Sequence, residues 1–303
     1  MRVGTVSGPR QDPLAAPPAG AVRRAVAAAL AEDLGPLGDI TAALVPGETT
    51  ARGLLVARQP GVLAGTACAT EAFAQVDGGL ELRWQLTDGA ALSPGSVIGE
   101  VSGALRSMLT AERTALNFLC HLSGVASLTR RYVEAVQAAN AATRVLDTRK
   151  TTPGLRALEK AAVRAGGGTN HRASLSDAVL VKDNHLAGLS IAGAVSEARR
   201  RWPGRMVEVE CDTAAQAKEA ASAGADVVMV DNMDPDQVAV CVAEIRADAA
   251  GRAPLVEVSG GVKLEQAPRY AAAGADLVSV GALTHSAPAL DIGLDVGDIG
   301  AGD

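Results

Sequence analysis

The chain has 303 residues, a formal net charge of −6, and an apolar share of 48% with only 2% aromatic residues. This length allows one large domain with a smaller companion, and a core of Ala, Val and Leu favours helices packed on a sheet. The acidic balance argues against a nucleic-acid-binding surface. No apolar run approaches the roughly 18 residues of a membrane span and no secretion signal is recognisable, so we expect a cytoplasmic protein that binds neither nucleic acid nor membrane. Its four cysteines are far apart, which indicates neither a zinc site nor a disulfide framework.

The first third of the chain predicts a tail followed by a small α+β domain. Residues 1–20 are rich in proline and glycine, so we expect them to form a flexible tail. Residues 21–34 have the apolar spacing of a helix. Between residues 52 and 101, short β-type runs alternate with turn signals, which predicts a small antiparallel sheet with a helix at residues 66–76 against it.

Two further helices are expected before the pattern changes. The first begins at Thr110, a good N-cap residue, and carries Glu112 in its first turn, where the helix dipole favours negative charge. We expect it to end at Ser123-Gly124. The second covers residues 126–139.

Beyond Thr143 the pattern becomes strand, loop and helix, repeated. AGADVVMV echoes AGADLVSV, and the apolar runs have the spacing of successive βα units. The six runs centre near Val145, Leu180, Glu208, Met229, Glu257 and Ser279. We therefore predict an α/β fold, an incomplete and about six-stranded parallel α/β barrel with an N-terminal α+β sandwich domain, in preference to a full eight-stranded barrel. The expected parts are a tail (1–20), the sandwich domain (21–116), the catalytic barrel (117–283) and a C-terminal segment (284–303) that returns to the sandwich domain.

Cationic residues gather where the first barrel strands end, and this is where parallel barrels place their active sites. The set comprises Arg149, Lys150, Arg172 and Lys182, with His171 beside them. A guanidinium meets a carboxylate with two parallel hydrogen bonds and an ammonium acts as a point charge, so the mixture suits a small ligand with more than one carboxylate. One such residue alone could be an ordinary surface charge, but four uncompensated cations at strand ends indicate an anionic ligand.

Acidic and glycine residues follow the remaining strands. Glu210 and Asp231 end successive strands, and two such carboxylates can hold Mg²⁺ or can instead pair with Arg or Lys across the barrel mouth. Turns at the last two strands suit phosphate binding on backbone amides; they contain Ser259, Gly260, Gly261, Gly281 and Ala282. The single loop histidines His185 and His285 are more often structural than catalytic.

These residues stand in motifs that resemble the quinolinate phosphoribosyltransferase family. The motifs are LTAERTALNFL, LDTRKTTPGLR, GGGTNHR, LVKDNH, VEVECDT, VMVDNM, VEVSGG and SVGALTHS, in that order, and the resemblance extends from about Glu32 to Asp295. It implies condensation of quinolinate with phosphoribosyl pyrophosphate, giving nicotinate mononucleotide, CO₂ and pyrophosphate for NAD biosynthesis, with Mg²⁺.

The resemblance also implies a role for each candidate residue. Arg113 looks like an arginine lent by the neighbouring subunit of a homodimer, which could assemble further. Glu210 and Asp231 look like the carboxylates around the ribose and the metal, and with Lys150 they are the expected catalytic residues. The quinolinate pocket would contain Arg149, Lys150, His171, Arg172 and Lys182, and the 5′-phosphate turns Ser259, Gly260, Gly261, Gly281 and Ala282.

Three alternatives stay open. A related transferase of the same fold, such as the molybdenum-locus homologue, would change the cation set, which is intact here. A non-catalytic phosphoribosyl or phosphate sensor would lose Glu210, Asp231 or Lys150, all of which are present. A Schiff-base lyase would use Lys182 or Lys150 in a desolvated or otherwise acidified state.

Overall fold

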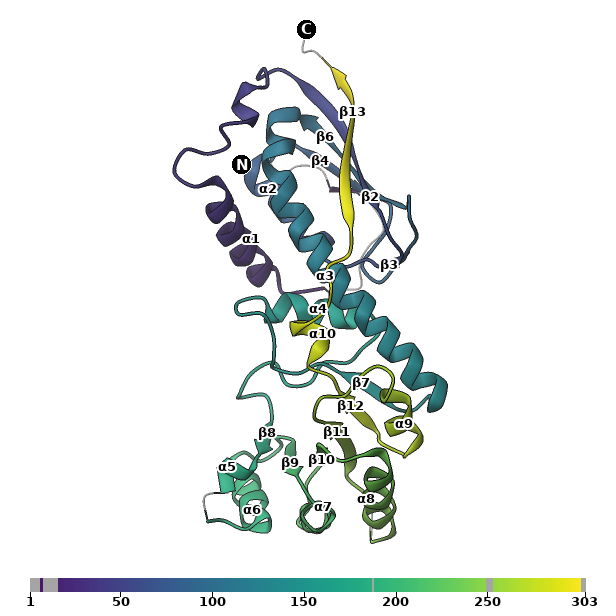
Figure 1. Ribbon diagram of the computed structural model, residues 1–303. Helices are drawn as coiled ribbons and strands as arrows, with labels where there is room; N and C mark the ends of the chain where they lie inside the picture. Colours follow the sequence, from purple (N-terminus) through teal and green to yellow (C-terminus); the bar gives the residue numbers. More distant parts are fainter. Residues whose placement is uncertain (1–5, 8–15, 187, 249–252, 301–303) are drawn as a thin grey trace. The chain divides into compact units, whose positions relative to one another are not determined.

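The protein is described by a computed structural model covering residues 6–7, 16–186, 188–248 and 253–300 (Figure 1). The chain divides into two compact units. The first holds Met1–Arg130, Thr152–Gly167 and Ser286–Asp303, and the second holds Arg131–Thr151 and Gly168–His285. Most of the expected N-terminal tail lies outside the described residues.

The first unit is built on a five-stranded sheet in the order β1-β4-β6-β2-β13. Its strands are β1 (Val6–Ser7), β2 (Thr50–Ala57), β4 (Glu81–Trp84), β6 (Val97–Ala104) and β13 (Ile292–Gly300), beside the separate pair β3 (Gly61–Val62) and β5 (Ala91–Leu92). Its helices are α1 (Ala19–Leu34), the 3₁₀ helix η1 (Ala42–Leu44), α2 (Thr66–Val76), α4 (Arg156–Ala165) and the part of α3 (Leu105–Ala139) up to Arg130. Because β13 pairs antiparallel with β2, the end of the chain completes this sheet.

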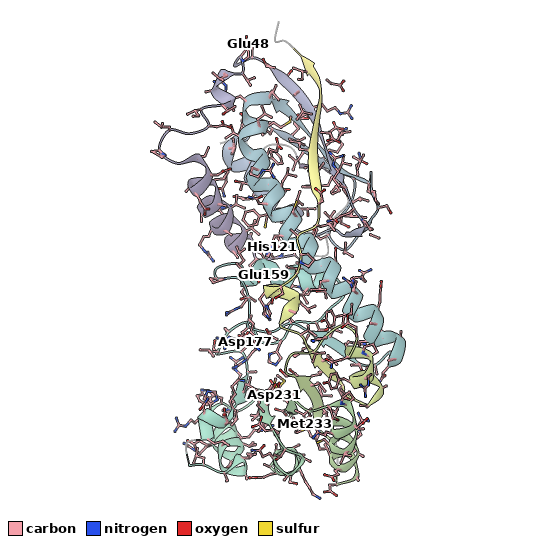
Figure 2. The ribbon with its side chains drawn as sticks, viewed as in Figure 1. Glu48, His121, Glu159, Asp177, Asp231 and Met233 are labelled. Carbon is pink, nitrogen blue, oxygen red and sulfur yellow. The ribbon has the colours of Figure 1, made fainter. Side chains whose placement is uncertain are left out.

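The helices of the first unit pack through the apolar faces that the sequence pattern predicts. The spacing that predicts a helix over residues 21–34 is confirmed in α1, which buries Val22, Val26 and Leu30. Helix α4 also carries the fully buried Glu159, whose carboxylate lies 2.9 Å from Nε2 of His121 (Figure 2). Glu159 further accepts a hydrogen bond from the backbone N–H of Thr152, so this buried carboxylate is satisfied.

The expectation of two helices separated at Ser123-Gly124 was wrong, because a single helix, α3 (Leu105–Ala139), covers the whole range. A Cβ atom at Gly124 would lie 2.1 Å from the carbonyl oxygen of Pro288, so glycine is needed here for close packing. Ser123 accepts a hydrogen bond from the N–H of Ala64 and donates one to its carbonyl oxygen. Both residues dock neighbouring segments against the helix, and neither ends it.

The second unit is an α/β structure with six parallel strands, in the order β7-β12-β11-β10-β9-β8, which confirms the six-stranded expectation. The strands are β7 (Arg144–Leu146), β8 (Val179–Val181), β9 (Val207–Cys211), β10 (Val227–Asp231), β11 (Leu255–Ser259) and β12 (Leu277–Ser279). The helices are α5 (Asp183–Leu186), α6 (Ile191–Arg201), α7 (Ala214–Ser222), α8 (Pro235–Ala247), α9 (Ala267–Ala272) and α10 (Ala282–His285). Helices α6 to α9 connect successive strands and pack beside them (Figure 1).

The aspartate of each repeated Gly-Ala-Asp sequence, which precedes one strand, bonds the start of the adjacent strand in the sheet. The carboxylate of Asp226 accepts a 2.7 Å hydrogen bond from the N–H of Val207 at the start of β9. In the same way, Asp276 accepts a 2.9 Å bond from the N–H of Val256 in β11. These contacts fix the relative register of the strands, and therefore the positions of the polar residues that end them.

Among the described residues, no helix combines the length and the hydropathy required to span a bilayer.

Candidate active site

The register of the parallel sheet gathers the strand-end residues on one face. Glu210 in β9 pairs with Met229 in β10, which pairs in turn with Glu257 in β11. Residues two apart along a strand lie on the same face, so Asp231 and Ser259, which are themselves paired, share it. Asp231 ends β10 at the carboxyl edge of the sheet (Figure 2). The predicted acids and the predicted phosphate turn therefore lie on one face of the second unit.

Lys182 and Glu210 form an ion pair at the ends of β8 and β9, between Nζ and Oε2. The lysine side chain is 40% exposed and the glutamate side chain 17%. The sequence left open whether Glu210 binds a metal or pairs with a cation, and the structure shows the pairing. An anion that binds Lys182 competes with Glu210 for the ammonium group.

Asp231 and the turn after β11 are joined through Asn232. The Asn232 side chain donates a 2.6 Å hydrogen bond to Asp231 Oδ2, and its backbone N–H donates to the carbonyl oxygen of Ser259. A Cβ atom on Gly260 would lie 2.4 Å from Oδ1 of Asn232, and Gly260 has a φ of +97°. Only glycine fits both the space and the backbone conformation, so the glycine of this turn has a structural reason in addition to any role with phosphate.

Lys150 lies over the other predicted phosphate turn. Its Cδ would be 3.2 Å from a Cβ on Gly281, and Nε2 of His285 would be 3.1 Å from the same atom. The Thr284 hydroxyl in α10 donates a 2.7 Å hydrogen bond to the carbonyl oxygen of Lys150. The structure therefore brings an exposed ammonium, a glycine turn and the start of α10 at Ala282 together, an arrangement suited to a phosphate group.

Arg149 and Arg172 act on one another electrostatically. Burial lowers the pKa of the Arg172 guanidinium first, and the positive charge of Arg149 lowers it further. The two loops that carry these arginines are joined by the fully buried Asp147, which accepts hydrogen bonds from the N–H of His171 (2.8 Å) and the side chain of Asn170 (2.6 Å). Two partly buried guanidinium groups whose charges act on one another suit an anionic ligand.

The comparisons with known proteins cover nearly the whole chain. Residues 39–123 match the description "Quinolinate phosphoribosyl transferase, N-terminal domain", and residues 125–295 match the C-terminal domain of that name. The carboxylating nicotinate-nucleotide pyrophosphorylase of Mycobacterium leprae is 44% identical over 91% of this chain and 97% of its own length. The human protein of that name is 40% identical over 84% of each chain. The solved structure of the Francisella tularensis pyrophosphorylase covers 95% of this chain and 100% of its own, with 37% identity and a TM-score of 0.87.

The chain belongs to the quinolinate phosphoribosyltransferase family. The family resemblance predicted from the motifs is confirmed, and the roles assigned to individual residues stay predictions. Arg113 lies on α3 in the first unit, where it is exposed, whereas every other predicted site residue lies in the second unit. Gly261 has a φ of +59°, and a Cβ atom added to it would meet no other atom within 4 Å.

Sequence reasoning did not single out three polar residues within the sheet of this transferase: Glu208 in β9, Glu257 in β11 and Ser279 in β12. All three are buried, and the Ser279 hydroxyl donates a 2.6 Å hydrogen bond to Glu257. A signal was present, since Glu208 and Glu257 are charged residues inside otherwise apolar strand runs. Each lies two residues before a predicted site residue and therefore on the same face of the sheet. Asp147 carried a similar signal, directly before Thr148-Arg149-Lys150.

Proposed function

We propose that this transferase condenses quinolinate with phosphoribosyl pyrophosphate and removes one carboxylate, giving nicotinate mononucleotide, CO₂ and pyrophosphate. The observation that carries the proposal is the pair of partly buried arginines, Arg149 and Arg172, whose positive charges act on one another and whose loops are joined through the buried Asp147. A pyridine dicarboxylate meets planar guanidinium groups with paired hydrogen bonds, so two arginines whose charges act on one another suit this substrate. Family membership supports the same reaction.

The bond changes divide into two steps. The ring nitrogen of quinolinate forms a bond to the anomeric carbon of the ribose while the bond from that carbon to the pyrophosphate oxygen breaks. The C–C bond to the carboxylate next to the nitrogen then breaks, its electron pair passes to the positively charged ring, and a proton takes the place of CO₂. No protein-bound electron sink is required, because the ribosylated ring carries the charge itself.

The residues of the site have matching tasks. The first step builds positive charge on the ribose, and Glu210 or Asp231 stabilises that charge electrostatically. Lys150 and the turns at Gly260 and Gly281 bind the phosphate groups of the ribose donor. Arg149, Arg172 and Lys182 hold the two carboxylates of quinolinate and so orient the ring nitrogen toward the sugar.

The acidic residues fit a role for Mg²⁺ in part. Glu210 and Asp231 supply two carboxylates at adjacent strand ends, and Mg²⁺ prefers a few carboxylates together with water and substrate phosphate oxygens. Glu210 is shared with Lys182, so Asp231 is the more available ligand. When bound with phosphoribosyl pyrophosphate, the ion would neutralise charge on the departing pyrophosphate.

We further propose that Arg113 acts across the interface of a homodimer. Its exposed position on α3, in the unit that carries none of the other site residues, supports a role toward a second copy of the chain. In a two-fold dimer, each active site would then take Arg113 from one subunit and the remaining residues from the other.

For Lys182, the Schiff-base alternative is disfavoured by the ion pair with Glu210, because a Schiff-base lysine must become a neutral amine to attack a carbonyl carbon. Incubation with a carbonyl substrate and borohydride should therefore leave Lys182 unmodified.

The direct test is incubation of the purified chain with quinolinate, phosphoribosyl pyrophosphate and Mg²⁺, with detection of CO₂ and nicotinate mononucleotide. Lys182→Met should abolish most of the activity. The matched control is Lys218→Met, which removes a lysine from a surface ion pair with Asp248. Absence of product with every divalent metal tried would refute the proposed function.

A further inference from the structure

Three ionisable side chains meet on the inner face of the sheet in the second unit. Glu208 and Glu257 are 0% and 1% exposed, and His171 lies between them. The Nε2 atom of His171 is 3.0 Å from Oε2 of Glu208 and 3.6 Å from Oε1 of Glu257. Two buried carboxylates this close cannot both carry full charge without a large cost in free energy, so the arrangement of protons among the three groups matters.

The hydrogen bonds assign one proton to Glu257. Both carboxylate oxygens of Glu208 are buried, and among the described residues neither accepts a well-aligned hydrogen bond. The Nε2 atom of His171 is close to Oε2 of Glu208, but the N–H group is not aligned for a hydrogen bond to it. A proton on the neighbouring Glu257 carboxyl supplies the missing donor, and the Ser279 hydroxyl satisfies Glu257 in turn. Burial raises the pKa of Glu257 to about 8 and the negative charge of Glu208 acts in the same direction, whereas positive charge on His171 and the hydrogen bond from Ser279 act in the opposite direction.

The hydrogen bonds also define the tautomer of His171. Its Nδ1 atom accepts a 2.8 Å hydrogen bond from the backbone N–H of Arg172, so Nδ1 carries no proton. The ring proton is therefore on Nε2, which faces the two carboxyl groups. If the ring were a protonated imidazolium, the hydrogen on Nδ1 would face the hydrogen of the Arg172 backbone N–H.

We infer that His171 is a neutral positioning residue that joins the buried Glu208–Glu257 pair to the loop carrying Arg172, and that it does not act as one of the cations that bind the substrate. The Nδ1 atom of its ring accepts a hydrogen bond from the backbone N–H of Arg172. The backbone N–H of His171 donates to Asp147, which precedes Arg149 by two residues along the chain. Both predicted carboxylate-binding arginines are thus tied to one buried network. This inference rests on the proposed function, because the role of Arg172 in binding quinolinate is part of that proposal.

A metal ion is the competing explanation for this cluster. The ligand atoms of His171, Glu208 and Glu257 lie within 4.8 Å of one another, a separation that a divalent ion could bridge. A metal would require a bare Nε2 atom and two deprotonated carboxylates. The hydrogen bond at Nδ1 leaves the ring proton on Nε2, and this proton opposes metal binding.

The protonation state of His171 can be measured directly by ¹⁵N NMR of the full chain labelled with ¹⁵N-histidine. The chain has four histidines, so substitution of His121, His185 and His285 one at a time identifies the His171 signals without altering that residue. We expect a bare Nδ1 and a protonated Nε2 from about pH 6 to 8, with or without quinolinate. Two protonated ring nitrogens near pH 7 would overturn the inference, as would one metal ion per chain that Glu257→Gln releases. This measurement needs no catalysis, so it stands apart from the test of the proposed function.

A pair of variants at Glu257 tests the consequence for the substrate. Glu257→Gln keeps a neutral group that can donate to Glu208 and accept from Ser279, whereas Glu257→Asp keeps the acid but shortens its reach. We expect the KM for quinolinate to stay within about threefold for Gln and to rise about tenfold or more for Asp. The KM for phosphoribosyl pyrophosphate should stay within about threefold in both. A larger effect of Gln than of Asp would show that Glu257 acts as a charged carboxylate and would overturn the inference.

Discussion

Replacing Glu257 by glutamine should change how the stability of the chain depends on pH. In the folded chain, Glu257 keeps its proton up to about pH 8, whereas the unfolded chain releases it near the ordinary value of 4.5. Between these values the folded state binds more protons than the unfolded state, so the free energy of unfolding of the wild type falls as pH rises. Glutamine has no proton to release, so the variant lacks this fall.

The size of the effect follows from the same linkage. A group protonated only in the folded state changes the free energy of unfolding by about 1.4 kcal/mol per pH unit. Glu257→Gln should therefore resemble the wild type near pH 5 and exceed it by on the order of 4 kcal/mol near pH 8. The groups facing Glu257 are Glu208 and His171, and both remain in the variant.

The assay is urea unfolding at several pH values, followed by circular dichroism and by the fluorescence of Trp202 in the second unit. The predicted effect is a difference between two curves of the free energy of unfolding against pH. The contributions of titrating groups that both proteins share therefore cancel. The control is Glu244→Gln, which removes an exposed carboxylate from α8 of the same unit. Parallel curves for the wild type and Glu257→Gln between about pH 5 and 8 would refute the assignment of a proton to Glu257.

Four further predictions concern the reaction. Nicotinate should be a poor substrate, because it leaves part of the cation set unanswered, and a catalytic efficiency close to that for quinolinate would contradict a dicarboxylate site. Arg172→Ala should weaken quinolinate binding far more than phosphoribosyl pyrophosphate binding, and Asp231→Ala should do the reverse or lower turnover; calorimetry showing equal effects would mean that the subsites are misassigned. Gly260→Ala should lower the affinity for phosphoribosyl pyrophosphate at least about tenfold, because the added methyl group meets the neighbouring Asn232, and unchanged binding would exclude this turn from the site. Mixed and reassembled Arg113→Ala and Lys182→Ala chains should recover about a quarter of wild-type activity, and no recovery after confirmed subunit exchange would withdraw the shared-site proposal.

Local patterns in the sequence were sufficient for the layout of the second unit. Six apolar runs at the spacing of βα units predicted six parallel strands, and polar residues directly after those runs predicted which residues gather at the strand ends. This succeeds because strand period and strand polarity are local properties, and because parallel strands bring their carboxyl ends to the same edge. The motifs also identified the family.

Only the tertiary structure decided how these side chains pair and that α3 continues without a break through Ser123-Gly124. In isolation Ser123-Gly124 looks like a helix stop. In the structure Ser123 bonds Ala64 and Gly124 lets Pro288 pack closely, while the helix continues through both residues. The sequence grouped His171 with the cations, but its ring proton depends on the N–H of Arg172 and on carboxyl groups from two separate strands. The charge of a buried residue is set by burial and by neighbours distant along the chain, and no local pattern in the sequence contains that information.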